Sequence, residues 1–581
     1  MRKTLTQNSL SNLGSRLRSI RNPDIFVLLA SAVVIAYLAL VPFITLIAAS
    51  FQSDFLNSDS AWTVVNFVQV FSDPVFYRLM INSVIYALST TIIATVLGTG
   101  LGWLYARTDV PLKRFGFIAI LIPFIMPGIL YAIAWILLCS SQIGLYNFLA
   151  HKLTGHTLFD IYSLPGMVFV EALHNAPLAF LMSSSVFSSM DSTLEEAGRI
   201  AGFNQFGVFK NITLKLALPG IFGAALLIFT RVVSGFEVPQ LIGTPAHIFV
   251  FVSQIYAAIQ SFPPNYGQAS VLGDVLLVLC LGGLYLSNHI TRNSSRFATI
   301  SGKSFKPQPI RLGKWRWPCA GIWIAVFVIV SAGPLMVIIW ASLLPEYQVP
   351  SLSLLYKLSF ANYANVFRFP DIGRSFSNSV IAALITGFIT MVLTTFAAYV
   401  VVKGKTKGRF FLDTLAFLPI TMPGIIVGIG ILFWYMIAPL PFNLYGTLTI
   451  LIIAFVTTNI PYGMRYMTAG MTQISTELEE AAVVSGASRI RIFLKIYLPL
   501  LAPSFIAGLI YTIITVFREV STAIFLYTPN SQILSITVYT LWQNGEFPMT
   551  AALGILILLF VVVLFSLLPI INRRKSVSTA L

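Results

Sequence analysis

The sequence predicts an all-α polytopic membrane protein of about twelve transmembrane helices, arranged as two six-helix repeats with parallel topology. Of its 581 residues, 57% are hydrophobic and only 10% are charged, with a mean hydropathy of +0.85. Soluble domains carry about 25% charged residues. Apolar runs long enough to cross the hydrocarbon, which takes about 20 residues, occur along the whole chain, and matching phrases recur in its two halves.

The predicted spans follow one another with short polar connections. The first span follows a polar leader and has no small-residue cleavage signature, so we expect a retained anchor rather than a signal peptide. Arg231 interrupts the fifth span, and Arg518 and Glu519 interrupt the eleventh. The twelve runs are 25–51, 81–106, 115–140, 163–188, 217–241, 268–290, 317–344, 376–402, 410–438, 447–471, 499–525 and 549–571.

These spans divide the chain into five predicted regions. They are a cytoplasmic leader (1–24), a first six-helix repeat (25–290) with a loop at 190–219, a basic cytoplasmic linker (291–316), a second repeat (317–571) with a loop at 474–503, and a cytoplasmic tail (572–581).

The net charge of +16 is a topology signal rather than a nucleic-acid footprint. If the N-terminus is inside, most of the 36 Lys and Arg residues fall in inside segments. The positive-inside rule then places both termini in the cytoplasm. We therefore expect no nucleic-acid partner. The outside segments hold only Arg78, Lys152, Lys357, Arg368 and Arg374.

Matched phrases show that the chain is a tandem duplication. "INSVI" at 81–85 matches "SNSVI" at 377–381, and "LIPFIMPGIL" at 121–130 matches "FLPITMPGII" at 417–426, both at an offset of 296. "LEEA" recurs at an offset of 284, and the pair Glu-Val at 282. Six crossings per half, an even number, give parallel repeats related by an axis along the membrane normal.

The most polar repeated phrase lies between the fourth and fifth spans of each half, on the predicted cytoplasmic side. Acidic residues at the start of a helix complement its macrodipole, and a glycine about two turns later can let the chain turn. A short interfacial helix with a glycine stop would explain one copy, but two copies in equivalent loops favour a function. The candidate residues are Glu195, Glu196, Ala197, Gly198 and Gly202, and Glu479, Glu480, Ala481, Ala482 and Gly486.

This phrase resembles the "EAA" loop of permeases from binding-protein-dependent ABC importers, which have the MetI-like fold. The second copy fits the whole pattern, with Glu480-Ala481-Ala482, then Gly486, Ile496, Leu498 and Pro499. The first copy has Gly198 in place of the second alanine and Lys215 in place of the proline. The resemblance implies that each loop docks on one subunit of an ABC ATPase dimer, which binds the ATP and Mg²⁺. It implies no cofactor in this chain and a permease rather than an enzyme.

The chain itself carries no phosphate-binding loop. The fragments "GKS" at 302–304 and "GKT" at 404–406 lack the glycine that this motif needs five residues earlier, where Phe297 and Tyr399 stand. The three cysteines fall in apolar runs with no metal-binding or disulfide spacing.

The fused layout is similar to that of the ferric-iron permeases, which are fed by a periplasmic ferric-iron-binding protein at the bacterial inner membrane. Much of this similarity lies in "FREVSTAIFLYTPNSQILSITVY" at 517–539. Importers of phosphonate, thiamine, polyamines or sulfate remain alternatives because they share the layout or the loop. A secondary transporter is a further alternative, and no His/Cys/Asp constellation supports a membrane enzyme.

Acidic residues inside apolar runs are the candidates for a substrate pathway, because charge in a membrane is costly and Fe(III) prefers oxygen ligands. Glu237 and Glu519 are related by the repeat, with Arg518 adjacent to Glu519. An ion pair with Arg231 or Arg518 is the structural alternative. The sequence does not define a metal site. Secondary candidates are Glu171, His174 and Arg465, and the pairs Pro123/Pro127 and Pro419/Pro423 are expected to kink helices.

Overall fold

The structure is a computed structural model that describes residues 23–56, 60–157, 159–191, 193–292, 309–404, 408–438 and 444–578. Within these residues the fold is helical, apart from two isolated β-bridges. The leader, much of the linker and the end of the tail lie outside them. The helices form two compact units, which are described separately.

Ten described helices are long and apolar enough to span a membrane. Three helix pairs are also apolar enough but bend sharply at a short break, so the count reaches thirteen when each pair is taken as one span. The ten helices correspond to ten of the twelve predicted spans, and two of the bent pairs lie at the other two predicted runs, 115–140 and 410–438. The third pair, Pro239–Ala246 with Phe251–Gln260, is bent by 79° and was not predicted.

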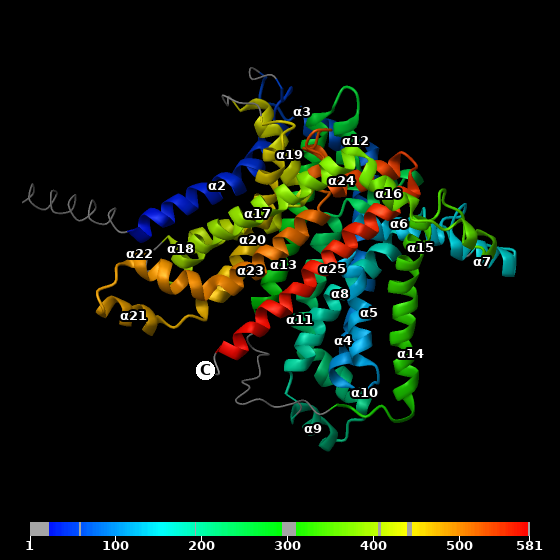
Figure 1. Cartoon of the computed structure of the whole chain (residues 1–581), viewed down its shortest axis with the longest axis horizontal. Helices are drawn as coiled ribbons and strands as arrows, with labels where there is room; N and C mark the ends of the chain where they lie inside the picture. The colour runs from blue at the N-terminus through cyan, green and yellow to red at the C-terminus, as the bar shows by residue number, and fades with distance from the viewer. Residues whose placement is uncertain are drawn as a thin grey trace, which may run out of the picture. The chain divides into compact units, whose positions relative to one another are not determined.

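Unit 2 comprises residues 49–373 and 537–559. Its long helices α4, α8 and α11 pack against one another (Figure 1). Its helices are α3 (Val65–Ser72), α4 (Pro74–Arg107), α5 (Lys113–Ile125), α6 (Gly128–Cys139), α7 (Leu145–Thr154), α8 (Leu164–Ser189), α9 (Thr193–Ile200), α10 (Gln205–Val208), η1 (Phe209–Thr213), α11 (Leu214–Val233), η2 (Pro239–Gly243), η3 (Thr244–Ala246), α12 (Phe251–Gln260), α13 (Tyr266–Arg292), η5 (Gly313–Trp315), α14 (Arg316–Val326), η6 (Phe327–Ala332), α15 (Gly333–Leu343), η7 (Leu352–Lys357) and α16 (Ala361–Arg368).

Unit 1 comprises residues 1–48, 374–536 and 560–581. Its helices are α2 (Pro23–Ser50), α17 (Pro370–Val402), α18 (Arg409–Phe417), η8 (Leu418–Thr421), α19 (Gly424–Ile437), α20 (Leu448–Thr472), α21 (Thr476–Val484), α22 (Arg489–Ile492), η9 (Phe493–Tyr497), α23 (Leu498–Arg518) and η10 (Ala523–Phe525). Helices α24 (Leu534–Gln543) and α25 (Phe547–Ser578) have residues in both units, and so, by a few residues at one end, do α2 and α17.

Capping residues and glycines explain how α4 and α8 start and pack. Asp73 caps α4 by accepting from the backbone N–H of Val75 at 2.8 Å, and Ser163 caps α8 in the same way from Gly166 at 3.1 Å. A Cβ on Gly98 would lie 2.5 Å from the carbonyl oxygen of Ala176. A larger residue than glycine would therefore keep the two helices further apart. Small residues at such contacts are typical of membrane helix interfaces.

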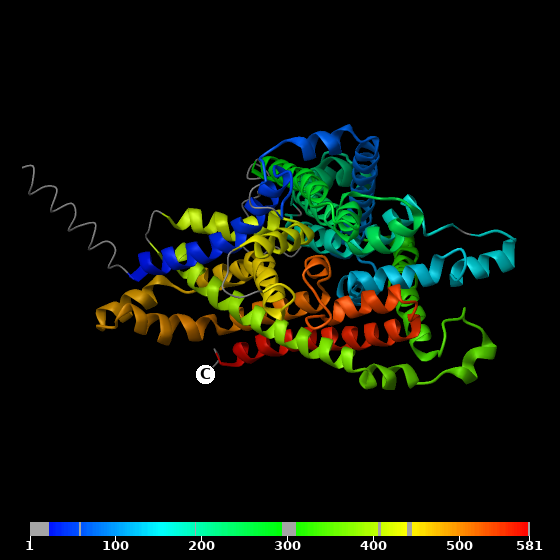
Figure 2. The ribbon, with the colours of Figure 1, turned by 90° about the horizontal axis from the view of Figure 1, so that it is seen from above.

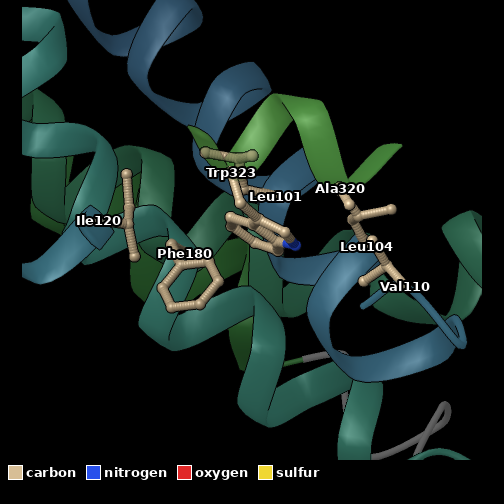
Figure 3. Packing of buried hydrophobic residues seen from close by; sticks show 7 residues of the cluster. All are labelled: Leu101, Leu104, Val110, Ile120, Phe180, Ala320 and Trp323. Atoms are coloured by element: carbon tan, nitrogen blue, oxygen red, sulfur yellow. The ribbon is translucent and has the colours of Figure 1, made fainter. Parts of the chain in front are cut away.

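The compact units do not coincide with the sequence repeats. The span that opens the second repeat, built from α14, η6 and α15, belongs to unit 2. Trp323 of α14 packs among Leu101, Ile120 and Phe180 in the core that Figure 3 shows. The hydroxyl of Tyr131 on α6 also donates to the carbonyl of Val330 at 3.2 Å.

Conversely, α2, which opens the first repeat, belongs to unit 1. It crosses α19 (Figures 1 and 2). A Cβ on Gly430 would lie 2.2 Å from the carbonyl oxygen of Pro42, so the glycine permits this crossing.

The fifth and eleventh spans end earlier than predicted. Helix α11 ends at Val233 rather than near 241, and α23 ends at Arg518 rather than near 525. Ser234 and Gly235 leave the helix after α11, and Glu519 is extended with φ −77° and ψ 123°. Glu237 and Glu519 therefore follow breaks in the helices instead of lying within continuous helices.

Candidate coupling loops and substrate pathway

The two repeated loops share one backbone plan. Helix α9 ends at Ile200, two residues before Gly202 with φ +92°, and α21 ends at Val484, two residues before Gly486 with φ +79°. The following N–H of Phe203 bonds back to Gly198 at 3.1 Å, and that of Ala487 to Ala482 at 3.0 Å. Glycine adopts this left-handed conformation at little cost. Each helix lies beyond the ends of the long helices of its own unit (Figure 1).

In the first loop, the two consecutive glutamates face opposite ways. Glu196 and Ala197 are exposed, whereas Glu195 is buried at 4% exposure. Glu195 forms an ion pair with the wholly buried Arg107 at the end of α4, and it accepts from the Thr213 hydroxyl at 2.6 Å. Of the predicted docking residues, Glu196 and Ala197 are therefore accessible to a partner, and Glu195 holds the loop to α4 and η1.

Gly198 also faces inward. A Cβ at this position would lie 2.3 Å from Cδ1 of Ile212. The small residue thus lets α9 pack directly on η1, which accounts for glycine where the second copy has Ala482.

In the second loop, a hydrogen bond from a tyrosine hydroxyl to a glutamate holds α21 to η9. Glu480 and Ala481 are exposed, and the half-buried Glu479 accepts from the Tyr497 hydroxyl at 2.6 Å. Lys403 occupies the position of Arg107 at the 296 offset. Its ammonium group donates to the Ile474 carbonyl at 2.6 Å and lies 5.9 Å from the centre of the Tyr497 ring.

The sequence interpretation missed Arg107, Thr213, Lys403 and Tyr497. A signal was available, since Arg107 and Lys403 recur at the offset 296, and Thr213 and Tyr497 at 284. Their partners are, however, 18 to 88 residues away in the chain, so only the folded structure identifies them.

Both predicted pathway carboxylates lie against the break in a bent helix pair. The pair of α5 and α6 bends by 103° before Gly128, and its counterpart in the other repeat bends by 104° before Gly424. A Cβ on Gly128 would lie 3.5 Å from the carboxyl carbon of Glu237, and one on Gly424 would lie 3.3 Å from Oε1 of Glu519. The helix segments that start at these glycines have Pro127 and Pro423 as their N-caps.

The two carboxylates differ in their partners. Oε1 of Glu519 accepts from the N–H of Thr522 at 3.0 Å and from its hydroxyl at 3.1 Å. In the described part of the chain, the carboxylate of Glu237 has no hydrogen bond and no ion pair. Arg231 lies instead 5.5 Å from the centre of the Phe124 ring, so the expected alternative of an Arg231–Glu237 ion pair is not formed.

The secondary candidates separate into two groups. Glu171 and His174 of α8 lie beside Glu237. Cε1 of His174 is 3.4 Å from a Cβ built on Gly128, and its ring stacks on Tyr131 at 5.2 Å. Arg465 is exposed and lies 5.1 Å from the centre of the Phe417 ring. No group of three His, Cys, Asp or Glu side chains converges among the described residues.

Comparison with known proteins identifies the class. Residues 94–287 and 390–577 each match the family described as "Binding-protein-dependent transport system inner membrane component". The chain belongs to this family. It is a multi-pass ABC importer permease with two fused permease repeats, and the family is one of transport permeases rather than enzymes.

Its relatives include ferric permeases. The chain is 24% identical to the "Ferric transport system permease protein FbpB" of Actinobacillus pleuropneumoniae over 86% of its length and 72% of that protein. It is 25% identical to the "Putative ferric transport system permease protein FbpB 1" of Haemophilus influenzae over 84% of its length and 76% of that protein. A "Sulfate transport system permease protein CysT" of Salmonella typhimurium is 24% identical over 35% of the chain and 78% of that protein.

Proposed function

We propose that this chain is the translocation subunit of a ferric-iron importer. The observation that carries the proposal is the similarity to two ferric permeases over more than four-fifths of the chain. The oxygen-bearing side chains at the breaks in the helices support it, because Fe(III) prefers oxygen ligands. Import of sulfate is the second candidate, since a sulfate permease is similar to part of the chain.

The partners in this proposal are a periplasmic ferric-iron-binding protein and a dimer of ABC ATPase subunits. The exposed Glu196–Ala197 and Glu480–Ala481 of the two loops are the proposed contacts with the ATPase. ATP and Mg²⁺ belong to that dimer, and this chain needs no cofactor of its own. In this proposal both termini and both loops lie in the cytoplasm, because the basic residues cluster in the segments assigned to that side.

The test is uptake by the complete complex. The chain would be purified with its ATPase and binding protein and reconstituted in proteoliposomes that contain ATP. We expect uptake of ⁵⁵Fe(III) and ATPase stimulation by the iron-loaded binding protein. Sulfate, phosphonate, thiamine and putrescine with their own binding proteins are the comparison solutes, and uptake of one of these without iron uptake contradicts the assignment.

A further inference from the structure

A group of oxygen-bearing side chains lies inside unit 2, next to the break between α5 and α6. Tyr86 comes from α4, Glu171 and Asn175 from α8, and Glu237 from the segment after α11. The amide of Asn175 donates to Oε1 of Glu171 at 2.8 Å. Glu171 interacts with the Tyr86 hydroxyl, and Glu237 acts on both electrostatically.

Several of these oxygens are buried without a hydrogen-bond partner. Tyr86 and Asn175 are each 1% exposed, yet neither the hydroxyl of Tyr86 nor Oδ1 of Asn175 makes a hydrogen bond of normal geometry within the described chain. The carboxylate of Glu237, which is half-buried, has none either among the described residues. Buried polar groups normally have hydrogen-bond partners, because leaving them unpaired costs folding free energy. A cluster of such unpaired oxygens therefore indicates a binding site for a ligand.

The fold does not require Tyr86 and Glu171, because the second repeat lacks both of these oxygen-bearing side chains. At the repeat offsets, Ala382 stands for Tyr86 and Phe455 for Glu171, whereas Asn459 and Glu519 retain the other two. The retained Glu519 is satisfied by Thr522, whereas Oδ1 of Asn459, like that of Asn175, is buried without a hydrogen-bond partner in the described chain. A scaffold role would apply equally to both repeats, so the additional oxygens of the first repeat point to a ligand.

We propose that Tyr86, Glu171, Asn175 and Glu237 form a transient site for a hard, oxygen-seeking cation on the translocation pathway, present in the first repeat only. The proposal rests on the proposed function and specifies where the cation stops. Two carboxylates, a phenol and an amide carbonyl are oxygen donors of the kind that such a cation prefers. A transient stop is consistent with the lack of a three-residue His, Cys, Asp or Glu cluster among the described residues.

The sharpest variant is Tyr86→Phe. It removes only a buried hydroxyl that makes no hydrogen bond of normal geometry within the described chain, so we expect little change in the melting temperature. Thr90→Val is the matched control, because Thr90 lies one turn further along α4 and its wholly buried hydroxyl also makes no hydrogen bond to the described residues. Glu171→Gln is the second variant, since glutamine keeps the oxygen that accepts from Asn175.

Two measurements on the complete complex test the site. We expect Tyr86→Phe and Glu171→Gln to lower ⁵⁵Fe(III) uptake at least about tenfold, the scale typical of weakened metal sites, with no change in uptake for Thr90→Val. Basal ATPase activity should stay at the wild-type value in the control Thr90→Val. Wild-type uptake in Tyr86→Phe and Glu171→Gln would overturn the proposal while leaving the iron function intact.

The second measurement does not depend on transport. Binding of Tb(III), a hard trivalent ion, is followed by its luminescence on the complex in nanodiscs. We expect weaker binding in Tyr86→Phe and Glu171→Gln than in wild type and Thr90→Val. Equal binding in all four proteins overturns the site. Loss of binding in the two variants, in a complex that takes up no iron, supports the site and contradicts the proposed function.

Discussion

At the scale of single residues, the two loops are held to the membrane helices by different chemistry. The first uses an ion pair between Arg107 and Glu195, both almost wholly buried. The second uses a phenol–carboxylate hydrogen bond, and the ammonium group of Lys403 bonds a backbone carbonyl instead. A buried charge that loses its partner is far more costly than a lost hydrogen bond at a half-exposed site.

This difference predicts unequal effects of matched substitutions. Arg107→Met should destabilise the protein by about 3–5 kcal/mol because it leaves Glu195 buried without its counterion. Lys403→Met should cost about 1.5–3 kcal/mol, the range for a lost hydrogen bond to a charged group. Unfolding in detergent with increasing denaturant measures both. Glu195→Gln added to Arg107→Met should restore part of the loss, and equal destabilisation by the two single changes would contradict the interpretation.

The two pathway carboxylates should also differ. Glu237→Gln should slow iron uptake more than Glu519→Gln, because Thr522 already satisfies Glu519 whereas Glu237 is unpaired within the described residues. Glutamine retains an oxygen acceptor, so both variants should fold. Initial uptake rates and expression measure the effect. If Glu519→Gln lowers expression and a further change at Arg518 restores it, Glu519 has a structural role.

At the scale of elements, prolines and glycines determine where helices break and turn. Pro127 and Pro423 precede the second segments of the two bent pairs. Proline lacks the N–H that would continue the helix, and its ring disfavours helical backbone in the residue before it. Gly202 and Gly486 turn the chain after α9 and α21. These turns leave Ala197 and Ala481 exposed on short helices at equivalent positions.

The exposed alanines provide a test of docking. Ala197→Trp and Ala481→Trp should each leave insertion and folding intact but reduce the ATPase retained on purification, because a close-packed interface tolerates added volume poorly. Lys152→Trp on α7 is the control, since Lys152 is also exposed and lies on the predicted opposite side of the membrane. Full ATPase retention by both loop variants would show that the ATPase binds elsewhere.

At the scale of the whole molecule, each compact unit includes the first span of the other repeat. The distribution of basic residues predicts that both termini and both loops share one side of the membrane. This orientation follows from charge rather than from the fold, so it requires its own experiment.

Reporter fusions measure that orientation. A reporter after Lys575 and one near Lys405 should both report the cytoplasm, and one near Asp59 the periplasm, because the basic residues cluster in the segments predicted to be inside. Insertion of an additional span before the C-terminal reporter is a control that should invert its signal. A periplasmic C-terminus in the unaltered chain would contradict the even number of spans.

The sequence by itself determined the membrane class, the positions of the ten long membrane helices, the duplication and the glycine turns of the loops. These follow from local pattern, because a chain in hydrocarbon must satisfy its backbone polar groups within each helix, and proline and glycine act on their own neighbourhood. Only the tertiary structure decided that Glu195 faces inward and Glu196 outward, and that α2 and α14 pack in the unit of the other repeat. It also brought Tyr86, Glu171 and Glu237 together from three helical segments. Such contacts join residues tens to hundreds of positions apart, and side-chain packing between helices, rather than local pattern, selects them.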